Sequence, residues 1–179
     1  MKIVADENIP LIKHYFGEQG ELLLKSGRDI TRNDLIDADM LLVRSVTKVN
    51  QALLQNTSVK FVGSATSGAD HVDTEWLDSQ SITWSVAHGC NAAAVAEYVV
   101  CMIAALQKKK FLLQKNIRAA VVGVGRIGQR VADKFQALGF EVVLCDPLRS
   151  DIYSTAFAAL SDLDLISFHT PLTCSGAYP

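Results

Sequence analysis

The sequence predicts an α/β protein with parallel sheets, and three observations support this fold class. Short apolar segments alternate with helical segments along most of the chain, which is the pattern of strands joined by helices. A long apolar helix divides this alternation into an earlier and a later part. The later part begins with a buried strand that runs directly into a glycine-rich turn. With 179 residues and 49% hydrophobic content, the chain is long enough to form one or two domains with buried cores.

The first ninety residues are predicted to form one domain around a parallel sheet. The expected strands are short and apolar, and the segments between them have helical character. We expect strands over residues 2–5, 21–24, 40–44, 60–63 and 82–85, and helices over 11–16, 49–55 and 74–79. Because such an alternation places helices on both faces of a parallel sheet, residues 1–90 are expected to form a flavodoxin-like or Rossmann-like domain.

A long helix is predicted over residues 91–110. Asn91 suits its N-cap, and the alanines that follow favour helix formation. Apolar residues cover most sides of this helix, which is typical of a helix buried between other elements. We therefore expect residues 91–115 to be a connecting helix and linker packed between two domains.

The rest of the chain predicts one β-α-β-α-β unit. Strands are expected over residues 118–122, 141–145 and 164–168, a helix over 127–138 and a short helix over 155–160. The first strand leads into a G-x-G-x-x-G turn, and the second strand ends in an acidic residue. This order of elements predicts the first half of a doubly wound, Rossmann-type dinucleotide-binding domain over residues 116–179.

Each residue of this motif has its own task in holding a dinucleotide. Gly123 permits the sharp turn out of the strand, Gly125 lets the backbone approach a pyrophosphate, and Gly128 lets the helix pack closely on the sheet. The free N–H groups at the start of the helix attract the anion. Asp146 can accept hydrogen bonds from the adenosine ribose and would repel a 2′-phosphate, so NAD is expected rather than NADP, although Arg149 nearby slightly favours the opposite choice. The alternatives are a purely structural turn and a methyltransferase-like site.

Two polar loops follow strands of the first domain. One carries Ser45, and the other carries Thr66 and Ser67 among glycines and small residues. Ligands of open α/β sheets bind beyond the carboxyl ends of the strands, where hydroxyl and N–H groups suit a carboxylate or phosphate. The residues alone also allow these hydroxyls to be helix caps or turn closures.

The spacing of histidines and cysteines predicts no metal site. His71 and His88 have no carboxylate or cysteine at a recognisable catalytic or ligand spacing, and His169 is expected to support the site rather than to donate a proton. The four cysteines are scattered, without a C-x-x-C pair. They are expected to be reduced thiols in a cytoplasmic protein.

Charge and hydropathy argue against nucleic-acid and membrane partners. The net charge is −2, and the basic run at residues 108–110 ends an apolar helix, where cations suit the helix dipole. The chain starts with a short strand rather than with a signal peptide. Its apolar runs are shorter than the roughly 20 residues of a membrane-spanning helix. We therefore expect neither a nucleic-acid nor a membrane partner.

Four stretches of the sequence resemble a known enzyme family. They are Met1–Pro10, Leu42–Asn50 (which contains R-S-V-T-K-V-N), Lys60–Asp73 and Gly89–Ala92. Together they resemble the erythronate-4-phosphate dehydrogenases, a family of D-isomer-specific 2-hydroxyacid dehydrogenases. The resemblance covers essentially the whole chain, and the R-S-V-T-K-V-N stretch is more specific than the glycine motif.

This resemblance implies an activity and a set of contacts. The activity is the oxidation of 4-phospho-D-erythronate to 2-oxo-3-hydroxy-4-phosphobutanoate with NAD, in pyridoxine biosynthesis, by a homodimer. Residues 1–90 would then be the N-terminal part of the substrate domain, with Ser45 and Thr66 as substrate contacts. The implied cofactor contacts are Gly123, Gly125, Arg126, Ile127, Gly128, Asp146 and Thr170, the last within the stretch His169-Thr170-Pro171-Leu172.

The sequence also departs from the family pattern. Taking a hydride from a hydroxyacid needs a base for the hydroxyl proton and a cation for the carboxylate. In the family these are an arginine, a glutamate and a histidine downstream of the H-T-P-L stretch, beyond Pro179. No catalytic residue is therefore expected in this chain, its NAD-binding domain is expected to be truncated, and the chain alone is expected to be inactive. The alternatives are a non-catalytic NAD- or partner-binding module of the same superfamily, and a degraded reading frame without a useful product.

Overall fold

The computed structural model describes residues 1–110 and 116–170. It divides into two compact units, Met1–Cys90 and Asn91–Pro179. Residues 111–115 of the predicted linker and the end of the chain from Pro171, which includes Leu172 and Cys174, lie outside the described part.

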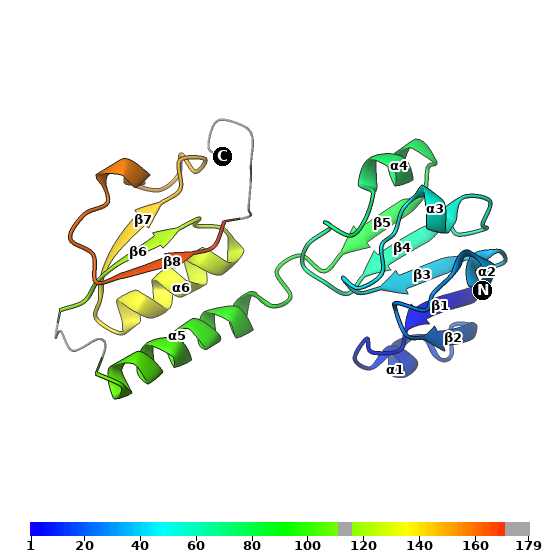
Figure 1. Ribbon diagram of the computed structural model, residues 1–179, viewed down its shortest axis with the longest axis horizontal. Coiled ribbons are helices and arrows are strands. Elements are labelled where there is room, and N and C mark those ends of the chain that lie inside the picture. The colour runs from blue at the N-terminus through cyan, green and yellow to red at the C-terminus, as the bar shows by residue number, and fades with distance from the viewer. Residues whose placement is uncertain (111–115, 171–179) are drawn as a thin grey trace. The chain divides into compact units, whose positions relative to one another are not determined.

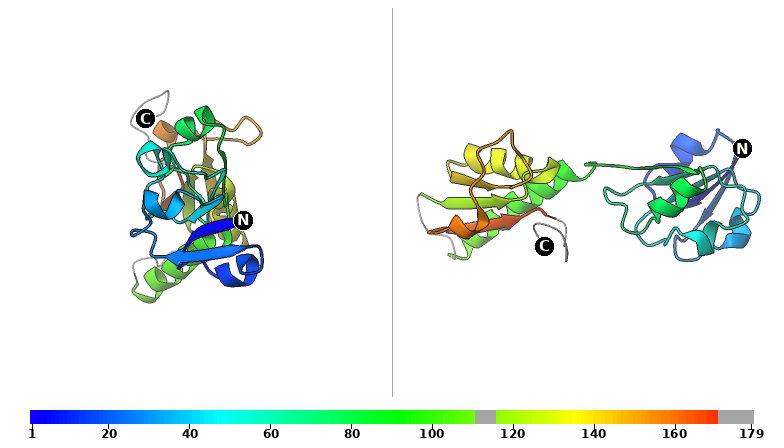
Figure 2. Two further views of the ribbon diagram at one scale, coloured as in Figure 1. Left: turned by 90° about the vertical axis from the view of Figure 1, so that its right-hand side faces the viewer. Right: turned by 90° about the horizontal axis from the view of Figure 1, so that it is seen from above.

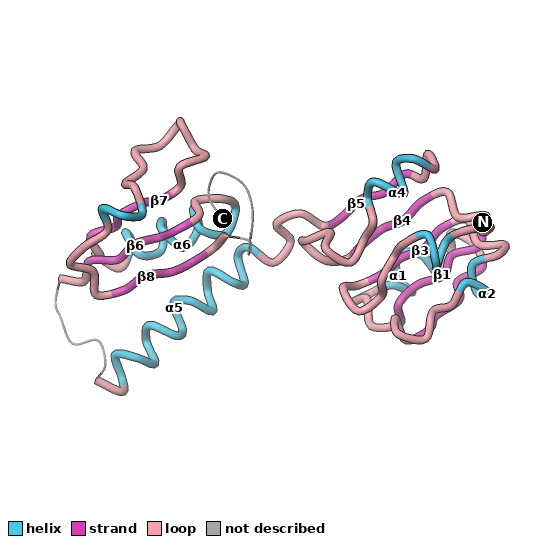
Figure 3. Tube along the Cα trace, turned by 45° about the horizontal axis from the view of Figure 1, so that its top comes forward, coloured by secondary structure: helices cyan, strands magenta, loops and turns pink. Residues whose placement is uncertain are grey.

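The first unit is built on a five-stranded parallel sheet with the strand order β2-β1-β3-β4-β5 (Figures 1 and 3). Its strands are β1 (Lys2–Asp6), β2 (Glu21–Lys25), β3 (Met40–Val43), β4 (Phe61–Ser64) and β5 (Thr83–Val86), and its helices are α1 (Ile12–Phe16), α2 (Arg32–Leu35), α3 (Gln51–Leu54) and α4 (Thr74–Ser79). All four strand pairings are parallel. The flavodoxin-like α/β arrangement predicted from the alternation is therefore confirmed.

Both faces of this sheet are buried, as expected for parallel strands. One core contains the side chains of Val4, Leu41 and Val62, among others. The other contains Ile3 and Leu42, which alternate with the first set along the same strands. The order of the strands reverses between β1 and β3, so the carboxyl ends of these two strands form a topological switch point.

Of the three helices predicted for the first unit, α4 has the predicted bounds and the other two are shorter than predicted. The predicted helix over residues 49–55 is reduced to α3, because Val49 forms a parallel bridge with Val72 and the Asn50 side chain caps the helix. The helix α2 was not predicted at all. It lacks an apolar repeat and begins with a capping box between Thr31 and Asp34, a local polar interaction.

The second unit consists of a three-stranded parallel sheet with the order β7-β6-β8 and two longer helices (Figures 1 and 2). Its elements are α5 (Ala92–Lys108), β6 (Arg118–Val122), α6 (Arg126–Ala137), β7 (Glu141–Cys145), the 3₁₀ turn Phe157–Ala159 and β8 (Leu165–Phe168). The predicted short helix over 155–160 is thus a single 3₁₀ turn. Gly139 closes α6 with a φ of 80°, the left-handed conformation that favours glycine after a helix.

The long helix α5 packs along α6 within the second unit. Ala96 and Ile103 of α5 share a core with Val121 of β6 and Phe135 of α6. Tyr98 and the rest of the outward side of α5 are exposed. The expectation of a helix buried on most sides is therefore wrong for the described structure, because only one stripe of α5 packs. Asn91 stands at the N-cap position but makes no side-chain capping bond.

Candidate functional site

The glycine turn lies at the switch point of the second sheet. The chain leaves β6, returns through α6 to β7 on one side, and then crosses to β8 on the other side of β6. The carboxyl ends of β6 and β8 therefore meet at the kind of position where open α/β sheets bind ligands. Gly123 follows β6, and Thr170 follows β8 directly beside it.

The three glycines of the turn differ in the space around them. A Cβ atom on Gly123, whose φ is 83°, would lie 2.7 Å from Thr170 Cγ2 and 2.9 Å from the His169 carbonyl oxygen. A Cβ atom on Gly128 would overlap the Gly123 carbonyl oxygen. A Cβ atom on Gly125 would meet no described atom within 4 Å. Gly123 and Gly128 are thus required by packing, whereas Gly125 leaves open space for an approaching group.

The start of helix α6 suits an anion. Gly125 occupies the N-cap, and the backbone N–H groups of the first turn of a helix have no partner within it. The helix dipole adds partial positive charge at this end. Arg126 is exposed at the turn, whereas Ile127 is half-buried and packs against the core of the second unit. This arrangement fits a pyrophosphate.

Asp146 ties the end of β7 to the glycine turn. Its Oδ2 accepts a hydrogen bond of 2.8 Å from the N–H of Val124, and its Oδ1 accepts one of 3.2 Å from Leu148. Each carboxylate oxygen has a second acceptor site, so the half-buried side chain can still accept hydrogen bonds from a ribose. Arg149 also contacts the turn, since its Nη1 donates to the Val124 carbonyl at 2.7 Å, and it pairs with Asp151. The contact of Arg149 with the turn was not predicted from the sequence.

His169 follows β8 and extends the sheet for one residue more. Its N–H donates to the Val122 carbonyl at 2.8 Å, and its Nε2 lies 2.8 Å from Ser167 Oγ. Burial lowers the pKa of His169 below its usual value. The backbone bond to Val122 holds His169 next to the glycine turn, and the ring bonds to Ser167. The supporting role expected for His169 stays a prediction.

The switch point of the first sheet carries a buried ion pair. Asp6 ends β1 and is fully buried, and Arg44 follows β3. Arg44 Nε donates to Asp6 Oδ2 at 3.0 Å, while the Asn8 N–H donates to Asp6 Oδ1 at 2.9 Å. The Arg44 side chain remains 33% exposed. Gly27 packs so closely that a Cβ atom there would overlap the Asp6 carboxylate. The pair therefore fixes a partly exposed cation immediately before Ser45.

The hydroxyls of Ser45 and Thr66 are not helix caps. Ser45 is exposed, and the helix after it is capped by Asn50. Thr66 is half-buried, and the helix after it is capped by Asp73. Thr66 Oγ1 donates to the Gly68 carbonyl at 3.4 Å, which is a turn closure of the kind the alternative described. Ser67 Oγ accepts a hydrogen bond from the Gly89 N–H at 3.0 Å and so links two loops. Ser45 and Thr66 both follow strands of one parallel sheet, β3 and β4, at its carboxyl edge.

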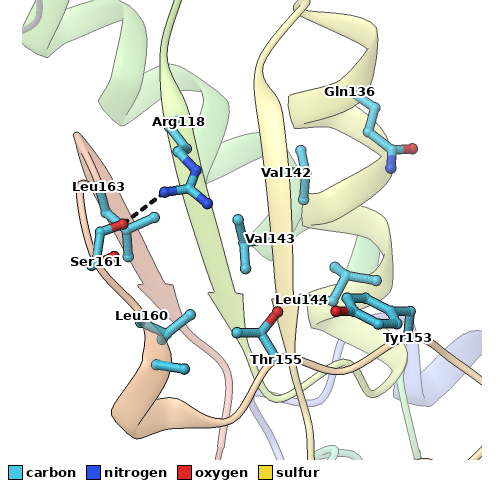
Figure 4. Close-up of a pocket in the computed structure, with 11 residues that line it drawn as sticks. Arg118, Gln136, Val142, Val143, Leu144, Tyr153, Thr155, Leu160, Ser161 and Leu163 are labelled. Carbon is cyan, nitrogen blue, oxygen red and sulfur yellow. Dashed lines mark hydrogen bonds between the residues drawn. The ribbon is translucent and has the colours of Figure 1, made fainter.

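A cavity of about 400 Å³ lies elsewhere in the second unit (Figure 4). It is bordered by Arg118 at the start of β6, by Val143 on β7 and by Tyr153, Thr155 and Leu160 of the segment between β7 and β8. Arg118 is already engaged, since it pairs with a glutamate of β7 and donates to the Ser161 carbonyl at 2.9 Å. None of the predicted cofactor residues borders this cavity.

The described residues offer little for metal or redox chemistry. Among residues 1–110 and 116–170, no three histidine, cysteine or acidic side chains are grouped so that they could hold a metal ion. Cys90, Cys101 and Cys145 are free thiols, and burial raises the pKa of Cys145. No helix in this same part of the chain has the length and apolar character to cross a membrane.

The chain is similar to known dehydrogenases. A model of the family "D-isomer specific 2-hydroxyacid dehydrogenase, catalytic domain" matches residues 2–170. The erythronate-4-phosphate dehydrogenase of Coxiella burnetii is 47% identical over 183 residues, which cover 100% of this chain and 50% of that protein. The protein of the same name from Acinetobacter baylyi is 47% identical over 182 residues, covering 100% and 51%. The chain thus spans about half the length of the curated relatives it matches.

Solved structures show the same fold. The cofactor-bound 3-phosphoglycerate dehydrogenase of Entamoeba histolytica, with NAD⁺, has a TM-score of 0.77 and 25% identity, covering 97% of this chain and 64% of that one. The D-lactate dehydrogenase of Aquifex aeolicus, complexed with NAD and lactic acid, has a TM-score of 0.76 and 22% identity, covering 97% and 61%.

Proposed function

Because the chain belongs to the D-isomer specific 2-hydroxyacid dehydrogenase family, we propose that it serves the NAD-dependent oxidation of 4-phospho-D-erythronate to 2-oxo-3-hydroxy-4-phosphobutanoate. Both curated relatives compared above carry the name erythronate-4-phosphate dehydrogenase. We place this reaction in pyridoxine biosynthesis, in the cytoplasm, and assign the working enzyme to a homodimer.

The single observation that carries the cofactor assignment is the shape of the glycine turn. Gly123 and Gly128 are required by close packing, and Gly125 leaves open space in front of the free N–H groups of α6. A turn that served only to connect two elements would need Gly123 and Gly128 but would not need a glycine at position 125. We assign the carboxylate of Asp146 to the adenosine ribose of NAD, whose hydroxyl groups it can accept hydrogen bonds from, and NAD would supply the hydride acceptor of the reaction.

The substrate assignment rests on the first unit. A phosphorylated hydroxyacid carries two anionic groups, which require cations and hydrogen-bond donors. Arg44, held by buried Asp6, and the hydroxyls of Ser45 and Thr66 supply such groups at the carboxyl edge of the sheet. We assign residues 1–90 to the substrate domain and residues 116–179 to the NAD-binding domain, with residues 91–115 as the connecting segment.

No proton-transfer role is assigned to a described residue. The arginine, glutamate and histidine that the family uses for this purpose are expected beyond the H-T-P-L stretch. Residues 1–179 should therefore bind the cofactor without turning it over. We expect saturable binding of NAD by calorimetry, binding of NADP weaker by about tenfold because of Asp146, and no formation of NADH with 4-phospho-D-erythronate above a control without protein.

Each result has a distinct meaning. NADH formation by residues 1–179 would contradict the absence of a proton-transfer group, and equal affinity for NADP would contradict the role of Asp146. If a longer product of the same gene binds both ligands but never forms NADH, the protein is a non-catalytic member of the superfamily instead.

A further inference from the structure

Thr66 is the last member of a hydrogen-bonded row that begins at a histidine. Ser64 ends β4 and is buried, and its Oγ lies 2.8 Å from His71 Nε2 and 2.7 Å from Thr66 Oγ1. Thr66 Oγ1 in turn lies 3.4 Å from the carbonyl oxygen of Gly68. The row thus runs from His71 through Ser64 and Thr66 to a carbonyl group on an exposed glycine.

The number of protons fixes the direction of this row. The Gly68 carbonyl can only accept, so Thr66 must donate to it. Since a hydroxyl has a single proton, Ser64 must then donate to Thr66, and His71 Nε2 must donate to Ser64. With the opposite tautomer, which carries its proton on Nδ1, Ser64 would donate to His71 and Thr66 to Ser64. No proton would then lie between Thr66 Oγ1 and the Gly68 carbonyl oxygen, so this hydrogen bond could not form.

The state of the histidine ring makes the tautomer decisive. His71 is half-buried, and burial lowers its pKa below the usual value, against the opposing effect of the neighbouring Asp70 carboxylate. The ring is therefore neutral at neutral pH, and only one of its nitrogen atoms carries a proton. The Thr66 hydroxyl donates a hydrogen bond away from Ser64 if the proton of the His71 ring is on Nε2. It donates to Ser64 instead if that proton is on Nδ1.

We propose that His71 is a positioning residue, which acts through Ser64 to hold the Thr66 hydroxyl as a hydrogen-bond donor for an anionic oxygen of the substrate. This rests on the proposed role of Thr66 as a substrate contact. The bond of 3.4 Å to Gly68 is long for a hydroxyl donor, whose bonds are normally 2.5–3.0 Å. A carboxylate or phosphate oxygen is a stronger acceptor and accepts this hydrogen bond in place of the Gly68 carbonyl when it binds. The row of hydrogen bonds sets the direction in which the Thr66 hydroxyl donates. It transfers no proton to the substrate.

The tautomer can be measured directly in the unmodified chain. Long-range ¹H–¹⁵N correlation spectra of histidine-labelled residues 1–179 distinguish a proton on Nε2 from one on Nδ1. We expect His71 to carry its proton on Nε2. A proton on Nδ1 would overturn the proposal, and this readout does not depend on the folding of any variant.

Variants then test the link to Thr66, with 4-phospho-D-erythronate as the probe. His71→Gln keeps an N–H donor near the position of Nε2 and should bind the probe within about twofold of the parent, whereas His71→Leu should bind about tenfold more weakly. In a Thr66→Val background, His71→Leu should cause no further loss, because the two residues act as one unit. The positioning role of His71 would be contradicted if the Gln and Leu variants lost the same affinity for the probe. It would also be contradicted if His71→Leu weakened binding by its full amount in the Thr66→Val background.

Failure of the proposed function has a different signature. If Thr66→Val binds the probe as well as the parent, or the parent does not bind it, the substrate role of Thr66 is wrong whatever the tautomer of His71. If Thr66→Val weakens binding of the probe but His71→Leu does not, Thr66 remains a substrate contact and only the positioning role of His71 is wrong.

Discussion

Gly128→Ala is expected to lower the free energy of unfolding by about 2–4 kcal/mol and to abolish NAD binding. The added methyl group would overlap the Gly123 carbonyl oxygen and lie 3.3 Å from Val121 Cγ1. Neither the turn nor the helix can yield without opening the contact between α6 and β6. The gain of about 1 kcal/mol in helix propensity when alanine replaces glycine is too small to offset this clash. Chemical denaturation and a calorimetric NAD titration measure the two effects.

Gly125→Ala is the matched control, because it adds the same methyl group three residues earlier. Gly125 has a φ of −79° and a ψ of −156°, which an alanine adopts without strain, and its Cβ would meet no described atom within 4 Å. We expect unchanged stability, or a gain of up to about 1 kcal/mol from the stiffer unfolded chain. NAD binding should still fall by at least about tenfold, because the methyl group occupies the space of the pyrophosphate. If this variant binds NAD normally, the turn is structural.

Asp6→Ala should destabilise the first unit by about 2–4 kcal/mol. The substitution removes a fully buried carboxylate and leaves the Asn8 N–H and the Arg44 guanidinium without their acceptor. Because Arg44 is 33% exposed and can turn toward water, the loss stays below that of a fully buried pair. Arg44 would no longer be held beside Ser45, so the affinity for 4-phospho-D-erythronate should fall as well. Denaturation and calorimetry with the probe report the two losses.

The exposed pair between Lys2 and Asp37 provides the control for Asp6. Its separation of 2.6 Å is shorter than that of Asp6 and Arg44, but the Asp37 side chain is 69% exposed. Ion pairs in water contribute little to stability. Asp37→Ala should therefore leave both the unfolding transition and the probe affinity unchanged. If Asp6→Ala behaves like Asp37→Ala, burial of the Asp6 carboxylate has no energetic consequence, and Arg44 does not depend on it.

Periodic and local features of the fold could be predicted from the sequence. The strands Arg118–Val122 and Glu141–Cys145 follow from apolar runs and have the predicted bounds. The other strands differ by one residue at one end, except β4 and β5, which are shifted by one residue at both ends. The glycine turn and Asp146 were recognisable because their spacing is local. By contrast, the helical pattern of α5 was over-interpreted: a mainly apolar composition does not show how many sides of a helix are packed, and only Ala92, Ala96 and Ile103 of it are buried.

Contacts that form only after the strands pair could not be predicted. Asp6 and Arg44 are 38 residues apart, and they meet because β1 and β3 are neighbours in the sheet. Both stood in the stretches used for the family resemblance, yet neither was singled out. The row from His71 to Thr66 depends on how the loop after β4 folds back on Ser64. His71 lies in a loop and Ser64 at the end of a strand, so no helical or strand periodicity relates the two residues.

The central claim is that two separate sites of this chain hold two different ligands, and a two-ligand NMR titration of ¹⁵N-labelled residues 1–179 tests it most directly. NAD should shift the amide signals of residues 123–128 and of Asp146 and leave those of residues 44–48 and 64–68 in place. The probe 4-phospho-D-erythronate should do the reverse. If neither ligand shifts the amide signals of the residues assigned to it, or if both ligands shift only the same set of signals, the assignment of an NAD site and a substrate site to these residues is wrong.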